Sequence, residues 1–362
     1  QPIRHYLFDE GEGDEVVNHA IFSPGKRAIG GGPLGSLSIT YRTHYGMATE
    51  NSYVDRWPAS VETEWCAGRV PGKSALRVGT RPVGLFRSGI TGREFAEGMT
   101  ICGWIKFEGD GKTGTASAFP LRLGTGTCNN GFLVRWDCSQ RFPRGRLAFS
   151  VGFPSAKGGA RGESVALDSC PPDVWHAFAV VRDAKGLRLW LDGVVAAKEV
   201  PGAVVSPFKD GKWPGEMAFT GYTHVNCLHI GNREGQVDPM PFALDEIAVF
   251  DRALSADELK AFLLVKPAAG TPDEQRAASA AERARRAALA KIVMKIPEDS
   301  NGYFRLGEKI PVTLEGAPSG AKLRLQLETT YGRKVFDRTV DASTSFAPDA
   351  CDVYRLDLTL FG

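Results

Sequence analysis

The chain has 362 residues, of which 43% are hydrophobic and 24% charged, the composition of a globular protein with a buried core. Its 44 basic and 42 acidic residues leave a formal net charge of +2. This balance argues against binding to nucleic acid or to an anionic membrane surface, because both require a basic excess. No run of 18 apolar residues is present, so we expect no transmembrane helix.

Short apolar segments separated by glycine- and proline-rich turns run through the first 266 residues. We expect strands, in chain order, over residues 4–9, 37–42, 99–107, 119–123, 132–138, 146–151, 164–168, 175–182, 186–191, 227–230 and 243–250. So many short strands at near-regular spacing predict an antiparallel sandwich or barrel. Residues 43–74 and 201–225 show no strand pattern, and we interpret them as irregular insertions.

The clearest single signal lies in residues 175–197. Ala177 and Ala179 alternate with Phe178 there, and Asp192-Gly193 stands between two apolar runs. An Asp-Gly pair in this setting predicts a hairpin with a type I′ turn, which requires positive φ at both central positions. The segment therefore predicts two strands of an antiparallel meander and the start of a third.

Two helices follow this β-rich region. Ser255 and Glu258 have the spacing of a capping box, which predicts a short helix. Thr271 and Glu274 form a second capping box with Pro272 at the first helical position, and we expect this helix to run to about residue 292. The apolar side of the second helix is mostly alanine, which is typical of a spacer or strut.

Residues 293–362 return to strand-like alternation and predict a second, smaller β-sandwich module. Its last predicted strand stops almost at Gly362, from which we expect that a longer protein continues beyond this point. We therefore divide the chain into residues 1–266, a linker with a helix over residues 267–292, and a truncated module over residues 293–362.

The chain contains seven cysteines, none of them in a Cys-x-x-Cys pair, so a zinc knuckle is not indicated. Cys128 and Cys138 flank one predicted strand. They either form a disulfide or remain buried thiols, because spacing alone does not decide connectivity.

Five segments, in the right order, resemble the laminin-G-like domains of the concanavalin A-like lectin/glucanase type. They are residues 6–13, 72–78, 99–106, 175–193 and 230–259. The resemblance implies an all-β jelly roll of two antiparallel sheets packed face to face, with the first and last strands adjacent. It also implies an extracellular, glycan-binding role within multidomain bacterial enzymes. We accordingly expect a secreted, periplasmic or cell-surface protein. Gln1 in place of Met fits either removal of a signal peptide or a start chosen for recombinant expression.

The same resemblance implies a structural calcium ion where the terminal strands meet. Calcium takes six to eight oxygen ligands from carboxylates and carbonyls. Asp245 matches the acidic position on the last strand and Asp9 lies on the first, so both are our candidate metal ligands. The alternative is that Asp245 caps a turn or pairs with an arginine.

We find no catalytic constellation in the sequence, although the jelly roll is known to host glycosidases and lyases. Retaining glycosidases need two carboxylates about 5–5.5 Å apart. Asp245 and Glu246 are consecutive and would point to opposite faces of a strand. Glu62 and Glu64 would share a face only if residues 61–65 were extended, and we interpret that segment as a loop.

Aromatic residues in the two irregular insertions are the best candidates for sugar binding, since an indole can cover the apolar face of a pyranose. Trp104, Trp175 and Trp190 lie in predicted strands and are expected to be structural, whereas Trp136, beside Arg135 and Asp137, fits either role. Aromatics in the insertions have an equally plausible structural role, which is to hold the insertions against the sandwich. The candidate carbohydrate-binding residues are Tyr53, Trp57, Trp65, Trp136, Trp213 and Tyr222.

Three functions agree with these observations. The first is a non-catalytic carbohydrate-binding portion of a secreted multidomain enzyme that degrades polysaccharides. The second is a structural or protein-interaction module that positions a downstream catalytic domain. The third is a jelly-roll glycosidase or lyase with an unrecognised site. The sequence favours the first, with a polysaccharide or other glycan as ligand and a catalytic domain downstream.

Overall fold

The computed structural model describes about three fifths of the chain. The described residues are 1–11, 15–17, 19–20, 37–41, 63–79, 83–86, 98–109, 116–123, 132–154, 160–200, 228–230, 240–289, 291, 293–295, 307, 309–316, 322–329, 334–340, 343–347 and 354–361. They form two compact units, residues 1–277 and 278–362. Within the described residues, neither helix is long and apolar enough to span a membrane.

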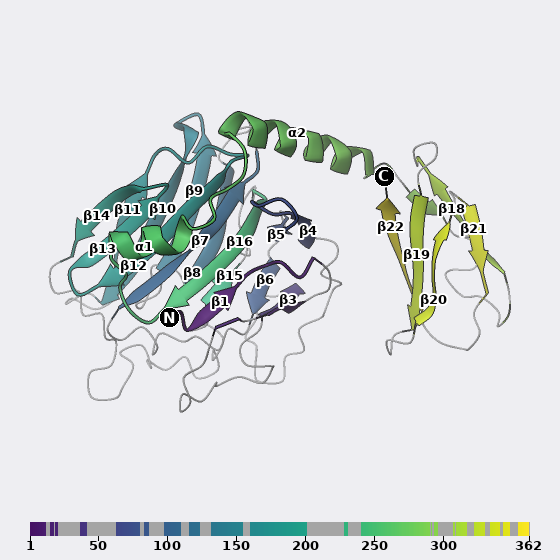
Figure 1. Ribbon diagram of the computed structural model, residues 1–362, viewed down its shortest axis with the longest axis horizontal. Helices are drawn as coiled ribbons and strands as arrows, with labels where there is room; N and C mark the ends of the chain where they lie inside the picture. Colours follow the sequence, from purple (N-terminus) through teal and green to yellow (C-terminus); the bar gives the residue numbers. More distant parts are fainter. Residues whose placement is uncertain are drawn as a thin grey trace, which may run out of the picture. The chain divides into compact units, whose positions relative to one another are not determined.

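The first unit consists of two eight-stranded antiparallel sheets, which confirms the all-β sandwich expected from the sequence (Figure 1). The first sheet contains, from edge to edge, β14 Val194–Glu199, β13 Gly186–Leu191, β12 Trp175–Asp183, β7 Met99–Phe107, β16 Phe242–Phe250, β5 Ser74–Val78 and β4 Thr63–Ala67, with β1 Arg4–Tyr6 paired to β16. The second contains β11 Ala160–Leu167, β10 Phe142–Pro154, β9 Phe132–Ser139, β8 Ala116–Leu123, β15 Leu228–Ile230, β6 Val83–Phe86, β3 Leu37–Tyr41 and β2 Glu15–Val16.

The interpretation of residues 43–74 as an irregular insertion is wrong for the last part of this segment. Thr63–Ala67 forms strand β4, which pairs residue by residue with β5 across the turn at residues 68–73. Its extended conformation depends on this pairing, with Trp65 opposite Leu76. The pairing partner lies outside the segment, so the segment's own pattern does not reveal the strand.

The core between the sheets is built around Trp136. Its ring is stacked on that of Phe107, with centroids 4.6 Å apart and planes 2° from parallel. Its Nε1 donates a hydrogen bond of 2.9 Å to the carbonyl oxygen of Cys170. Gly145 has φ +71°, and a Cβ there would lie 2.0 Å from that same carbonyl oxygen, so a side chain at this position is excluded.

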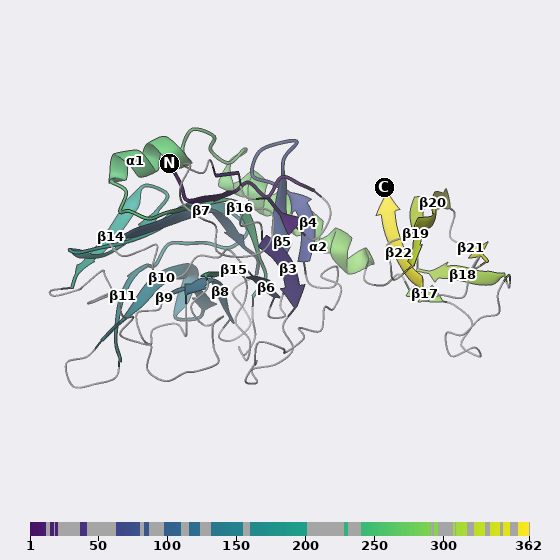
Figure 2. The same ribbon diagram turned by 90° about the horizontal axis from the view of Figure 1, so that it is seen from below.

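The outer face of the first sheet is buried as well. Trp104, Trp175 and Trp190 lie on it and are 4%, 7% and 1% exposed, which confirms their expected structural role. Helix α1, Ala256–Leu263, covers this face with Leu259 and Leu263. Figure 2 shows the layers edge on, with α1 on the outer side of the first sheet and the second sheet on the other side.

Both predicted capping boxes are present. Glu258 N donates to Ser255 Oγ over 3.2 Å, and Ser255 N donates to Glu258 Oε2 over 2.9 Å at the start of α1. Thr271 and Glu274 exchange the equivalent bonds at the start of α2, Pro272–Leu289. Helix α2 thus begins where the sequence predicts and ends three residues earlier than expected.

The second unit contains two three-stranded antiparallel sheets. One has the order β17 Val293–Lys295, β18 Ile310–Glu315 and β21 Ser343–Phe346, and the other has the order β20 Lys334–Val340, β19 Lys322–Thr329 and β22 Tyr354–Phe361. Leucine alternates with polar residues over residues 323–327 and 356–360; these segments lie in β19 and β22, which pair with each other. The alternation in residues 293–362 therefore corresponds to strands, and the division of the chain into modules stays a prediction.

The Asp192-Gly193 turn has positive φ at both positions, 48° and 91°, as predicted. The Asp192 side chain also reaches back to β12, where Oδ1 accepts a hydrogen bond of 2.9 Å from the amide of Ala177. Its Oδ2 lies 2.5 Å from Nδ1 of His176, whose Nε2 lies 2.8 Å from the carbonyl oxygen of Pro171. Both partners are acceptors, so both ring nitrogens must donate and the buried imidazole is protonated.

This arrangement makes the stability of the first unit depend on pH. Burial acts to lower the pKa of His176, but Cys170 and the Asp192 carboxylate raise it well above its usual value of 6.5. Because the pKa is higher in the folded chain, the stabilisation is complete below the unfolded-state pKa. It is lost as the pH rises through the folded-state pKa.

We therefore expect Asp192→Asn to destabilise the protein by about 1–3 kcal/mol at pH 6, because a hydrogen bond to a charged group is lost. Asparagine keeps the acceptor for Ala177 and tolerates the positive φ of this turn. Urea unfolding between about pH 6 and 9 measures the free energy of unfolding of both proteins. The difference in this free energy between the variant and the wild type should become smaller as the pH rises. A difference independent of pH would show that His176 is not charged in the folded chain.

Candidate functional site

The two consecutive acidic residues of β16 do not point to opposite faces, contrary to the expectation from the sequence. Glu246 has φ +56°, and the pairing of β16 with β7 shifts register between Asp245 and Ala248. This bulge directs both carboxylates to Arg69, in the turn between β4 and β5. The amide of Arg69 donates to Asp245 Oδ2 over 3.1 Å, and its guanidinium donates to Glu246 Oε2.

Arg69 connects three segments of the first unit. Its side chain is 4% exposed and lies over the ring of Trp104, 4.8 Å from the centroid. The guanidinium also donates to the carbonyl oxygen of Lys266, and the carbonyl oxygen of Arg69 accepts 2.8 Å from the amide of Ala269. The Arg69 guanidinium therefore connects the turn between β4 and β5 to the bulge in β16 and to the linker before α2.

The two carboxyl groups respond differently to this environment. Burial raises the pKa of Asp245 to about 6, although the amide and charge of Arg69 act in the opposite direction. Burial also acts on Glu246, but hydrogen bonding from His5 and the charge of Arg69 lower the pKa of that carboxyl. Asp245 thus takes the role that we considered as the alternative, pairing with an arginine.

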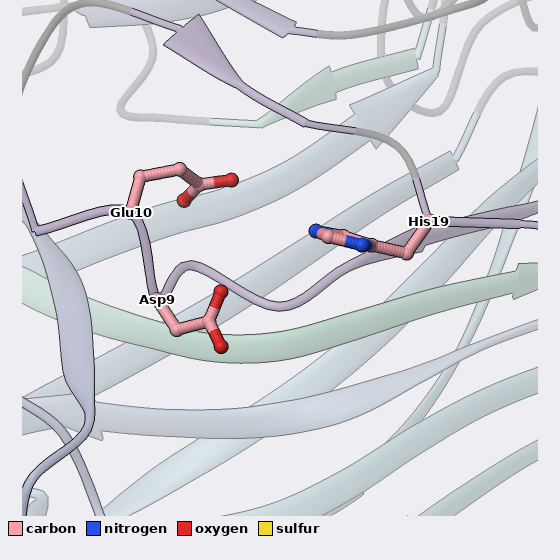
Figure 3. Close-up of side chains that lie close together, drawn as sticks. All are labelled: Asp9, Glu10 and His19. Carbon is pink, nitrogen blue, oxygen red and sulfur yellow. The ribbon is translucent and has the colours of Figure 1, made fainter.

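A second group of polar side chains lies after β1. Atoms of Asp9, Glu10 and His19 that can bind metal all lie within 4.8 Å of one another, and Figure 3 shows the three side chains pointing into a common space. Lys73 Nζ is 2.6 Å from Asp9 Oδ2. Glu10 Oε1 accepts 2.8 Å from the amide of Val17, while Glu10 Oε2 is buried and has no hydrogen-bond partner among the described residues.

The two predicted metal ligands thus differ in their surroundings. Asp9 belongs to a group with suitable donors for a cation, whereas the carboxylate of Asp245 is bound to Arg69 and is not in that group. Glu10 and His19 were not identified from the sequence. Strand β2 separates them in the chain, and their spacing matches no recognisable metal-binding motif.

The predicted sugar-binding aromatics are only partly described. Tyr53, Trp57, Trp213 and Tyr222 lie outside the described residues. Trp65, on β4, is half-buried and packs against the core between the sheets. Trp136 is fully buried in that core, so it is a structural residue and presents no surface to a sugar. Cys138 is also buried, and Cys128 lies outside the described residues, so a Cys128–Cys138 disulfide and buried thiols both stay open.

The outer face of the second sheet carries charged and aromatic side chains on β8, β9 and β10. Arg135 Nε donates to Asp137 Oδ1 over 2.6 Å, and Arg146 stands opposite Asp137 in the pairing of β9 with β10. The side chains of Arg135 and Arg146 are 47% and 34% exposed, while that of Asp137 is 17% exposed.

Two phenylalanine rings lie beneath these guanidinium groups. The guanidinium of Arg135 is 5.6 Å from the ring centroid of Phe119, and those of Arg141 and Arg146 are 5.2 and 4.7 Å from that of Phe142. We call Arg135, Arg141 and Arg146 the arginine strip. The alternation of Arg135 with buried neighbours on β9 places it outward, but the sequence does not reveal that β10 brings Arg146 beside it.

Comparison with known proteins finds one family model that matches part of the chain. Residues 90–260 match the family model Laminin_G_3, described as the concanavalin A-like lectin/glucanases superfamily. No curated protein matches the sequence significantly.

Solved structures with a similar arrangement share little sequence with this chain. The binding domain of Paraclostridial Mosquitocidal Protein 1 has 11% identity and a TM-score of 0.41, covering 72% of this chain and 51% of that one. The CBM40 of Ruminococcus gnavus IT-sialidase, bound to α2,3-sialyllactose, has 19% sequence identity and a TM-score of 0.33. The match covers 46% of this chain and 83% of that one. Domain 4 of the arabinanase AbnA from Geobacillus stearothermophilus, in complex with arabinotriose, has 14% sequence identity and a TM-score of 0.38. The match covers 72% of this chain and 97% of that one. This chain thus spans about half of the mosquitocidal protein's binding domain.

We expect Arg69→Ala to destabilise the first unit by about 3–5 kcal/mol, because it leaves two partly buried carboxylates without their cation. The double variant Arg69→Ala/Glu246→Gln should recover part of that loss, since one uncompensated charge is removed. Lys73→Ala is the control, since its ion pair with Asp9 is exposed and its removal should leave the melting temperature nearly unchanged. If Arg69→Ala and Lys73→Ala changed the melting temperature equally, the ion pairs of Arg69 with Asp245 and Glu246 would have no special stabilising role.

Proposed function

We propose that this chain, whose residues 90–260 match the model of the concanavalin A-like lectin/glucanases superfamily, is a carbohydrate-binding β-sandwich. The observation that carries the proposal is the distribution of exposed polar groups over the two sheets. Helix α1 and its flanking residues bury the outer face of the first sheet. The outer face of the second sheet instead exposes Arg135, Arg146 and Ser164.

The chemistry of this second face suits a sugar. Hydroxyl groups of a saccharide need both donors and acceptors, and charged partners make the stronger hydrogen bonds. The guanidinium groups of Arg135 and Arg146 supply donors, and the partly exposed carboxylate of Asp137 supplies acceptors. Trp57 and Trp213 remain part of the proposal as aromatic contacts for the apolar face of a pyranose.

We also propose a wider setting for this activity. The chain would be the binding portion of a secreted bacterial enzyme that degrades polysaccharides, with a catalytic domain downstream. The resemblance noted in the sequence supports this setting. In the alternative setting, the chain is a module that positions the catalytic domain, and the chain itself then binds no glycan.

The purified chain should be retarded in affinity gel electrophoresis by at least one polysaccharide in a panel of neutral and acidic polymers. Trp57→Ala and Trp213→Ala should each reduce the retardation, because an apolar contact of about 1–3 kcal/mol is lost. Val194→Ala is the control, since Val194 is exposed on β14 of the first sheet. Absence of retardation by every polymer would refute the proposed function.

For the metal, we propose calcium at Asp9 and Glu10 rather than at Asp245. Calcium prefers oxygen ligands, and Glu10 Oε2, which is buried and meets no hydrogen-bond partner in the described part of the chain, is a suitable one. His19 supplies nitrogen, a donor that zinc accepts more readily than calcium does. The two carboxylates therefore fit calcium, and His19 would be its neighbour.

Calcium in excess over a chelator should raise the melting temperature, because a ligand that binds only the folded state stabilises it. Glu10→Gln should abolish this rise, while Glu199→Gln on the exposed strand β14 should leave it unchanged. Differential scanning calorimetry measures the shift for each variant. A shift with zinc and none with calcium would contradict the calcium assignment.

A further inference from the structure

We infer that the arginine strip on the outer face of the second sheet binds an anionic saccharide, one that carries carboxylate or sulfate groups. This inference rests on the proposed carbohydrate-binding function and adds the chemical class of the ligand. It is carried by Arg135 on β9 and Arg146 on β10, with Arg141 in the turn that joins these two strands.

The pairing of β9 with β10 brings the strip together. Arg146 lies directly opposite Asp137, and Arg135 lies two residues from Asp137 on the same face of β9. Directly opposite residues have Cβ atoms about 4.5–5.5 Å apart, and diagonal neighbours lie within reach of long side chains. Arg135 and Arg146 can therefore contact one ligand from two adjacent strands.

Contacts with aromatic rings orient the guanidinium groups before a ligand arrives. Phe119 lies beneath Arg135, and Phe142 contacts both Arg141 and Arg146. Attraction between a guanidinium and a ring face restricts the otherwise mobile arginine side chain. Binding then costs less conformational entropy than it would with unrestrained arginines.

The charges of the strip favour an anion over a neutral sugar. Among the described residues, Arg135 pairs with Asp137 and Arg146 with Asp168, and Arg141 over Phe142 adds a third positive charge. Arg135 and Arg146 both act on Asp137, which is partly buried between them, whereas Asp168 is 71% exposed and only 3.3 Å from Arg146 Nε. An exposed ion pair of this kind contributes little, so an incoming anion can replace Asp168 at small cost.

The shape of the guanidinium group supports the same ligand class. Its planar fork of donors matches the two oxygens of a carboxylate or sulfate group, which accept two parallel hydrogen bonds. Adjacent hydroxyl groups of a neutral saccharide can also accept from this fork, but they carry no charge, so their hydrogen bonds are weaker. Uronate-containing and sulfated polysaccharides share the required chemistry, and the experiment below separates them.

The test measures the Kd of the full chain for four polymers by isothermal titration calorimetry. Polygalacturonate supplies carboxylates, chondroitin sulfate supplies sulfates as well, and arabinan and pullulan are neutral. Arg135→Gln and Arg146→Gln should each weaken binding to the preferred anionic polymer by about three- to tenfold. Binding should also weaken between about 50 mM and about 300 mM NaCl, because salt screens exposed charges.

Arg252→Gln is the matched control. Arg252 is 49% exposed and pairs with Glu258 near α1, so this variant also removes one exposed, ion-paired arginine. Its affinity for the anionic polymer should stay within about twofold of wild type. Circular dichroism confirms that the variants are folded, as expected for substitutions at exposed side chains.

The outcomes separate this inference from the proposed function. Binding only to neutral polymers would overturn the anionic class while leaving carbohydrate binding intact. Anionic binding that the double variant Arg135→Gln/Arg146→Gln does not weaken would overturn the assignment to the arginine strip. Binding to none of the four polymers, nor to any in the wider panel, would refute the proposed function and this inference with it.

Discussion

Burial of both faces of the first sheet is the constraint on which the rest of the first unit depends. Strand β12 places Phe178 on the inner face and Ala179 on the outer, and both are buried. Removing apolar surface from water is the main favourable term in folding, so each face needs a cover. The second sheet covers the inner face and helix α1 the outer. Charged side chains such as those of Arg135 and Arg146 are therefore found on the outer face of the second sheet.

Arg69 connects the first sheet to the segment of chain that follows helix α1, the element that covers the outer face of this sheet. A single positive φ at Glu246 produces the bulge that brings two carboxylates to this guanidinium, which also binds the backbone of the linker at Lys266. A buried charge of this kind is tolerated only when it is paired and hydrogen-bonded. The junction thus fixes the position of the linker relative to the last strand of the sheet.

Much of the fold could be predicted because its signals are local. The strands at residues 99–107 and 186–191 have their predicted bounds, and both capping boxes mark real helix starts. Strand β4 could not be predicted, because its extended conformation depends on pairing with β5 across a turn. The direction of Glu246 was missed for a similar reason, since strand alternation fails at a bulge that forms only within the sheet.

The amino-acid sequence by itself determined the antiparallel sandwich, its Asp192-Gly193 turn and the helices that follow, because alternation, turn chemistry and capping act over a few neighbouring residues. Only the tertiary structure decided which side chains meet. It placed Trp136 in the core, gave Asp245 an arginine partner, and set Arg135 beside Arg146 on adjacent strands. These juxtapositions depend on strand order and register, which join residues far apart in the chain and leave no mark in the local pattern.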